Sequence, residues 1–128
     1  MNNTIYKWQP QIDNFPKSIS IIGLHDDLHG FRIIIKDDES DRHFKFTFNN
    51  YIAYRNSDEG ARLKSYHLFP SNSREWCLFN TFNSDFIDWI VTESTGIYSH
   101  KDITHYFFTT SDDIIEVLAL DEPLIEKI

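Results

Sequence analysis

The sequence predicts an α+β fold in which an antiparallel β-sheet of about six or seven strands packs against one principal helix near residues 84–95. Two patterns support this prediction. Short segments that alternate apolar and polar side chains, typical of half-buried strands, occupy much of the chain. A single segment instead shows apolar residues at helical spacing. At 128 residues, the chain is expected to form a single domain over residues 1–128.

The first part of the chain predicts four strands in an antiparallel meander with one solvent-exposed face. The clearest is residues 42–48, where Phe44, Phe46 and Phe48 fall on one face and polar side chains fall on the other. The acidic segment at residues 37–41 has the composition of a hairpin turn. The three other strands are expected at residues 5–8, 18–24 and 31–36.

The middle of the chain is less regular. Residues 51–72 predict loops rather than strands, because residues 54–60 and 71–73 are rich in turn-forming side chains. An apolar, aromatic segment at residues 76–82 then predicts a strand.

The helix has recognisable ends. Ser84 is suited to cap its N-terminus, and Asp85 lies in the first turn, where the helix dipole favours an anion. Gly96 is suited to the left-handed position that follows a helix. The apolar side of the helix is formed by Phe86, Ile87, Trp89, Ile90 and Val91.

The C-terminal part predicts a second hairpin. Residues 103–109 and 114–120 are rich in β-branched and aromatic side chains, and a polar turn separates them. A short helix over residues 113–120 is the alternative, because several of these residues are acceptable helix formers.

Charge is distributed unevenly. Residues 1–74 carry ten basic and nine acidic side chains, whereas residues 75–128 carry eleven acidic and only two basic ones, Lys101 and Lys127. The negative net charge of −8 therefore comes from the C-terminal part. Such a field repels nucleic acid and attracts a basic protein, so we expect no direct binding to nucleic acid.

The sequence argues against several classes of protein and site. No apolar run approaches the roughly 20 residues of a membrane span, and no secretory signal is recognisable, so we expect a soluble, cytoplasmic protein that binds no membrane. The single cysteine, Cys77, excludes an intramolecular disulfide and is expected to be a buried thiol. We expect no cofactor and no metal, because His25 and His29 flank two carboxylates in a polar turn rather than on a helix.

Histidines are the candidates for acid–base catalysis. His43 and His105 would form a catalytic pair if they converged across a sheet, as in acid–base ribonucleases, and His100 lies two residues from Asp102. Nothing in the sequence brings these side chains together, and common nucleophile and phosphate-binding motifs are absent. We therefore expect no catalytic residue and no enzyme activity. A small His-dependent hydrolase or nuclease is the alternative.

Acidic side chains are the candidates for partner binding. Glu93 falls on the apolar side of the helix near its C-terminal end, where the dipole disfavours an anion. It therefore reaches solvent at the helix end, or it pairs with a partner or with Arg55 or Arg62. Clusters of carboxylates serve either solubility or the attraction of a cationic partner. We predict that the partner-binding residues are Asp85, Asp88, Glu93, Asp112 and Asp113.

Five aromatic and acidic segments carry a resemblance to a known class of proteins. They are residues 54–63, 76–79, 83–89 (Asn-Ser-Asp-Phe-Ile-Asp-Trp), 103–109 and 113–118. Together they resemble small acidic bacterial immunity proteins of contact-dependent growth-inhibition and other polymorphic toxin systems, over residues 51–123. The resemblance implies that the chain neutralises a cognate toxin domain, and many such toxins are nucleases with basic active sites.

The expected function is therefore that of a non-enzymatic immunity protein whose partner is a basic toxin domain. Its carboxylates would occupy the place of substrate phosphates in the toxin active site, and its aromatic side chains would exclude water around them. A non-enzymatic oligomeric adaptor is an alternative from another class, and it predicts a large exposed apolar patch.

Overall fold

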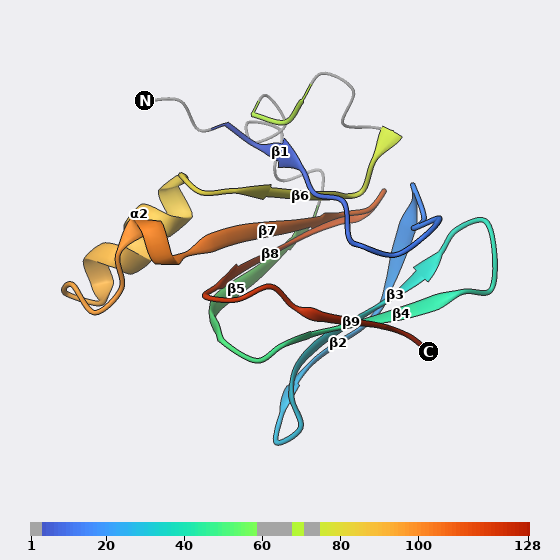
Figure 1. The fold of residues 1–128 in the computed structure, drawn as a ribbon, viewed down its shortest axis with the longest axis horizontal. Coiled ribbons are helices and arrows are strands. Elements are labelled where there is room, and N and C mark those ends of the chain that lie inside the picture. Colours follow the sequence, from blue (N-terminus) through green and yellow to red (C-terminus); the bar gives the residue numbers. More distant parts are fainter. Residues whose placement is uncertain (1–3, 59–67, 71–74) are drawn as a thin grey trace.

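The structure is a computed structural model that describes residues 4–58, 68–70 and 75–128 (Figure 1). Within these residues the fold is mostly antiparallel β-sheet with one α-helix, as the predicted class requires. The elements in chain order are β1 (Tyr6–Lys7), β2 (Ile19–Asp27), β3 (Gly30–Asp37), β4 (His43–Phe48), β5 (Tyr51–Asp58), β6 (Leu78–Thr81), α2 (Asp85–Glu93), the short 3₁₀-helix η3 (His100–Asp102), β7 (Thr104–Thr109), β8 (Asp113–Ala119) and β9 (Leu124–Lys127).

The strands form two sheets, whereas the sequence predicted one sheet with fewer strands. The five-stranded sheet has the order β1-β6-β7-β8-β5, and the four-stranded sheet has the order β2-β3-β4-β9 (Figure 1). Alternate side chains of both sheets enter one shared core. This core is filled by large aromatic side chains, which include Phe31, Phe44, Phe46, Phe48 and Phe108. The prediction counted strands by local pattern, which does not reveal how many sheets they form.

The predicted meander is confirmed for β2, β3 and β4, which pair in sequence order. It is wrong for residues 5–8, because β1 pairs with β6 of the other sheet, with Tyr6 opposite Asn80. The physical reason is the residue that follows β1. Trp8 is buried in the shared core against Phe46 and Tyr106, and this packing holds the N-terminal segment beside β6.

Two strands were not expected from the sequence. Residues 51–58 form β5, which pairs with β8, so the predicted loop is wrong for this segment. β5 is the last strand in its sheet, where polar side chains such as those of Asn56 and Asp58 stay exposed. β9 pairs with β4 and completes the four-stranded sheet. The remaining predicted turn residues, 59–60 and 71–73, lie outside the described residues.

The predicted helix is confirmed as α2, and its N-terminal cap is the expected one. The Ser84 hydroxyl accepts a hydrogen bond from the Ile87 amide at 3.1 Å. The helix ends slightly earlier than predicted. Thr95, with a φ of 50°, takes the left-handed position after the Ser94 cap, and Gly96 follows with a φ of 93°.

The strand predicted at residues 76–82 is confirmed in its central part as β6, and β7 and β8 form the predicted C-terminal hairpin. The alternative helix over residues 113–120 is therefore wrong. α2 packs on the face of the five-stranded sheet that points away from the shared core (Figure 1). The contact is a buried apolar cluster. Phe86 and Ile87 of the helix pack there against Ile103, which precedes β7, and Leu118 of β8. This packing brings the first turns of α2 beside β5, where the candidate site lies.

Candidate functional site

A surface pocket lies between α2 and the edge strand β5. Its volume is about 400 Å³, and its walls are aromatic on the helix side. Trp89 is 53% exposed and stacks on the buried ring of Phe86, with 5.9 Å between ring centres. The pocket is lined by Ala53, Tyr54, Arg55, Asp85, Phe86 and Trp89.

Arg55 is fixed in the pocket wall by a buried carboxylate. Its Nε and one terminal nitrogen donate to the two oxygens of Glu116 at 2.6 and 2.8 Å. The guanidinium also lies over Phe86, 4.3 Å from the ring centre. The pair forms because the register of β5 and β8 places Arg55 opposite Glu116. Since Glu116 is fully buried, its charge requires such compensation.

The polar chain continues inward through His105 and Ser84. His105 Nε2 lies 3.0 Å from a Glu116 oxygen, and the Ser84 Oγ lies 2.7 Å from His105 Nδ1. A carboxylate only accepts, so a neutral His105 carries its proton on Nε2 and accepts a hydrogen bond from the Ser84 hydroxyl at Nδ1. This order of serine, histidine and carboxylate is that of a hydrolase relay. Its members, however, are only 9%, 2% and 0% exposed for Ser84, His105 and Glu116.

Three of the five predicted partner-binding residues lie on α2. Asp85 is exposed in the first turn and lines the pocket. Asp88 is half-exposed, and one of its oxygens lies 2.7 Å from His100 Nε2. Glu93 is exposed at the helix end and therefore reaches solvent, whereas Arg55 is bound to Glu116. The other suggested cation, Arg62, lies outside the described residues.

The other two predicted residues do not line the pocket. Asp112 is in the turn between β7 and β8, and Asp113 is the first residue of β8. Along the same strand, Leu118 under α2 is about 17 Å from Asp113 at the usual rise, and Glu116, opposite Arg55 of the pocket wall, is about 10 Å from it. The structure therefore brings Asp85 and Asp88 together but places Asp112 and Asp113 at a separate end of the sheet.

The suggested pairing of His43 with His105 is wrong. His43 lies in β4 of the four-stranded sheet, and its Nδ1 contacts the Asp41 carbonyl at 2.7 Å. His105 lies in β7 of the other sheet. Their strand neighbours, Phe44 and Tyr106, enter the shared core, so the two histidines point outward on opposite sides of it. His100 and Asp102 lie in the short 3₁₀-helix η3.

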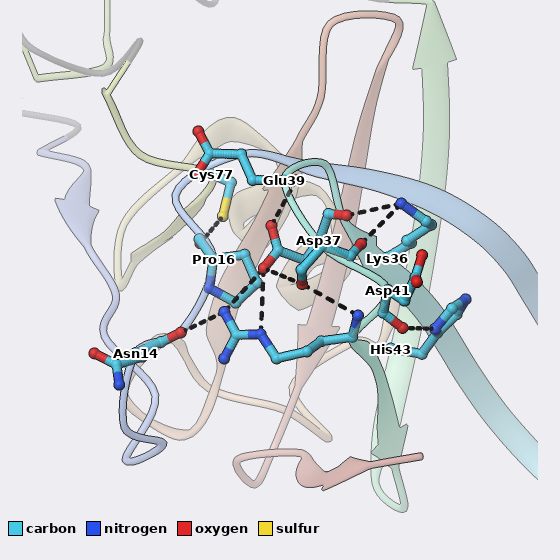
Figure 2. Close-up of polar contacts among 10 residues, drawn as sticks. Asn14, Pro16, Lys36, Asp37, Glu39, Asp41, His43 and Cys77 are labelled. Carbon is cyan, nitrogen blue, oxygen red and sulfur yellow. Dashed lines mark hydrogen bonds and ion pairs between the residues drawn. The ribbon is translucent and has the colours of Figure 1, made fainter.

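A second polar cluster surrounds Asp37 at the turn between β3 and β4 (Figure 2). Burial alone would raise the pKa of this carboxyl. Hydrogen bonds from the Glu39 amide, the Arg42 guanidinium and the Ser40 hydroxyl outweigh burial and lower the pKa below its ordinary value. Arg42 also donates to the Asn14 carbonyl at 2.7 Å. The cluster ties the N-terminal segment to the turn, which is a structural role.

Cys77 is buried, as expected, and its thiol donates to the Pro16 carbonyl at 3.3 Å (Figure 2). Burial raises the pKa of this thiol to about 12, so it stays protonated and is a poor nucleophile.

Within residues 4–58, 68–70 and 75–128, no group of three histidine, cysteine or carboxylate side chains is placed to hold a metal ion. No helix in the same part of the chain is long and apolar enough to cross a membrane.

The sequence prediction missed Arg55, Glu116 and Ser84 as parts of one cluster. One signal was present. Glu116 stands at the same alternation as Ile114 and Leu118, within a run of otherwise apolar residues, and a carboxylate in such a position requires a partner. The identity of that partner depends on the pairing of β5 with β8, which the sequence alone did not predict.

Comparisons of the chain with protein-family models, with curated proteins and with solved structures find no match.

Proposed function

We propose that this protein is an immunity protein that binds a cognate bacterial toxin domain and neutralises it. The observation that supports this function best is the surface formed by the pocket and the first turns of α2. It presents an exposed indole, that of Trp89, beside the carboxylates of Asp85 and Asp88. Aromatic side chains dominate the binding energy of many interfaces, and carboxylates beside them select a basic partner.

The proposed toxin is a basic nuclease domain of a contact-dependent inhibition system, inhibited by occlusion of its active site. Its cationic groups normally bind substrate phosphates. The acidic surface of α2 would occupy those groups. The charge of the C-terminal part, with eleven acidic and two basic side chains over residues 75–128, would favour the encounter.

The test begins with the protein as bait in lysate of its own source at low and moderate salt, followed by mass spectrometry. A retained basic domain is then expressed in a laboratory bacterial host with and without this protein. We expect the domain alone to arrest growth and co-expression to restore it. A retained domain that is harmless alone, or growth arrest that persists on co-expression, would contradict the proposed function.

The relay of Ser84, His105 and Glu116 favours a second candidate function, a small hydrolase. It predicts ester hydrolysis by the isolated protein that is lost in both Ser84→Ala and His105→Ala. The burial of all three side chains, and the ion pair between Glu116 and Arg55, favour a structural role instead. Assays with p-nitrophenyl esters distinguish the two roles, because a structural relay gives no turnover above the buffer rate.

A further inference from the structure

The balance of charge within the pocket indicates what kind of group it accepts. The Arg55 guanidinium is neutralised by the two oxygens of Glu116, so its charge is compensated inside the wall. Asp85, in contrast, is exposed, and no cation pairs with it among the residues that the structure describes. The uncompensated charge at the pocket is therefore negative.

The aromatic wall favours a flat cation. The ring of Phe86 already carries one guanidinium, that of Arg55, at 4.3 Å from its centre. Trp89 stacks beside Phe86 at an interplanar angle of 25° and keeps half of its surface exposed. An indole is the strongest of the natural side chains in attracting a cation to its face. Asp85 lines the same pocket four residues before Trp89 on α2, so its carboxylate lies on the same side of the helix as the indole.

We propose that the pocket between α2 and β5 receives one arginine side chain of the toxin domain, with its guanidinium over Trp89 and against Asp85. This inference rests on the proposed function and names the contact that anchors the complex. Arginine suits the pocket better than lysine, because its planar guanidinium stacks on an aromatic face and can bind both oxygens of one carboxylate. The pocket volume of about 400 Å³ is ample for one such side chain.

The first experiment tests the pocket without the toxin. Nα-acetyl-arginine amide is titrated into the ¹⁵N-labelled protein while the indole and backbone N–H signals are followed by NMR. Nα-acetyl-citrulline amide, which has the same shape without the charge, is the matched control ligand. We expect saturable shifts of the Trp89 indole and of the Asp85 and Phe86 amides with the arginine probe. Binding of the citrulline probe should be weaker by about fivefold or more.

Two variants and one control variant assign the contact. Asp85→Asn should weaken arginine binding about fivefold, and Trp89→Leu should remove the saturable shifts. Asp112→Asn, which removes a carboxylate at the other end of the five-stranded sheet, should leave the affinity unchanged. Equal affinity for the two probes, or an equal effect of Asp85→Asn and Asp112→Asn, would overturn the proposal.

The second experiment uses the captured toxin and separates this inference from the proposed function. Asp85→Asn and Trp89→Leu should each weaken the toxin complex at least about fivefold, and one arginine of the toxin should lose its effect on affinity in the Trp89→Leu background. A toxin bound equally well by wild type and both variants would refute the arginine pocket and leave the immunity function standing. Binding of the arginine probe together with a captured domain that is harmless alone, or with growth arrest that persists on co-expression, would support the pocket and refute the immunity function.

Discussion

Glu116 organises the candidate site because its carboxylate is buried within a strand of apolar neighbours. It binds Arg55 on one side and His105 on the other, and His105 in turn binds the helix cap Ser84. One ionised residue thereby connects β5, β8, β7 and α2. Removing a partner of a buried charge costs more than the pair itself contributes, since the remaining charge stays out of water.

Arg55→Ala should therefore destabilise the protein by about 2 kcal/mol. The value is lower than for a fully buried pair, because the Arg55 side chain is 43% exposed and water can approach the carboxylate in its place. Urea unfolding at neutral pH measures the loss. The control is Arg32→Ala, which removes the partner of Asp27, and it should cost less because the Asp27 carboxylate left behind is 46% exposed whereas Glu116 is fully buried. Equal losses in the two variants would show that Glu116 does not depend on Arg55.

Asp37 gives the stability of the protein a defined dependence on pH. Its pKa is lowered in the folded state, so the stabilisation is present above its ordinary value of 3.8 and is lost as the pH falls through the lower folded value. Asp37→Asn should destabilise the protein by about 1 to 3 kcal/mol at pH 7, and the difference from wild type should shrink below about pH 4. Urea unfolding at a series of pH values tests this. If the stability difference between Asp37→Asn and wild type stays constant down to about pH 3, the destabilisation comes from altered packing or hydrogen bonding and not from the lost charge.

Helix α2 depends on an N-terminal cap that has two partners. The Ser84 hydroxyl accepts from the Ile87 amide and contacts His105. Ser84→Ala should lower the free energy of unfolding by about 1 to 2 kcal/mol and speed amide hydrogen exchange in the first turn of α2. Ser99→Ala is the control, because Ser99 precedes η3 without capping it through its side chain. Unchanged exchange at the Ile87 amide in Ser84→Ala would show that the helix does not need this cap.

Elements whose residues carry their own pattern could be predicted from the sequence. The alternation of Phe44, Phe46 and Phe48 predicts β4, and helical spacing after Ser84 predicts α2. β5 could not be predicted in the same way, because its polar residues resemble a turn and become a strand through pairing with β8. The cluster at the candidate site could not be predicted for the same reason, since Arg55 and Glu116 are 61 residues apart and meet only through that pairing.

The fold divides the negative charge of the molecule into separate surfaces. Asp85 and Asp88 accompany the pocket on α2, whereas Asp112 and Asp113 lie at the far end of β8. Both pairs contribute to the long-range field that attracts a basic protein. Only a pair inside the interface would also affect how fast the proposed toxin partner dissociates. Association and dissociation rates therefore distinguish the two surfaces.

The protein with both Asp85→Asn and Asp88→Asn should bind the proposed toxin about threefold more slowly at low ionic strength, because two charges of the proposed binding surface are lost. The association rate should also depend less steeply on salt, and dissociation should be faster. The double variant Asp112→Asn with Asp113→Asn is matched in charge and should leave dissociation unchanged. Stopped-flow kinetics at several salt concentrations measure both rates. Faster dissociation in the second variant and not in the first would move the binding surface from α2 to the turn between β7 and β8.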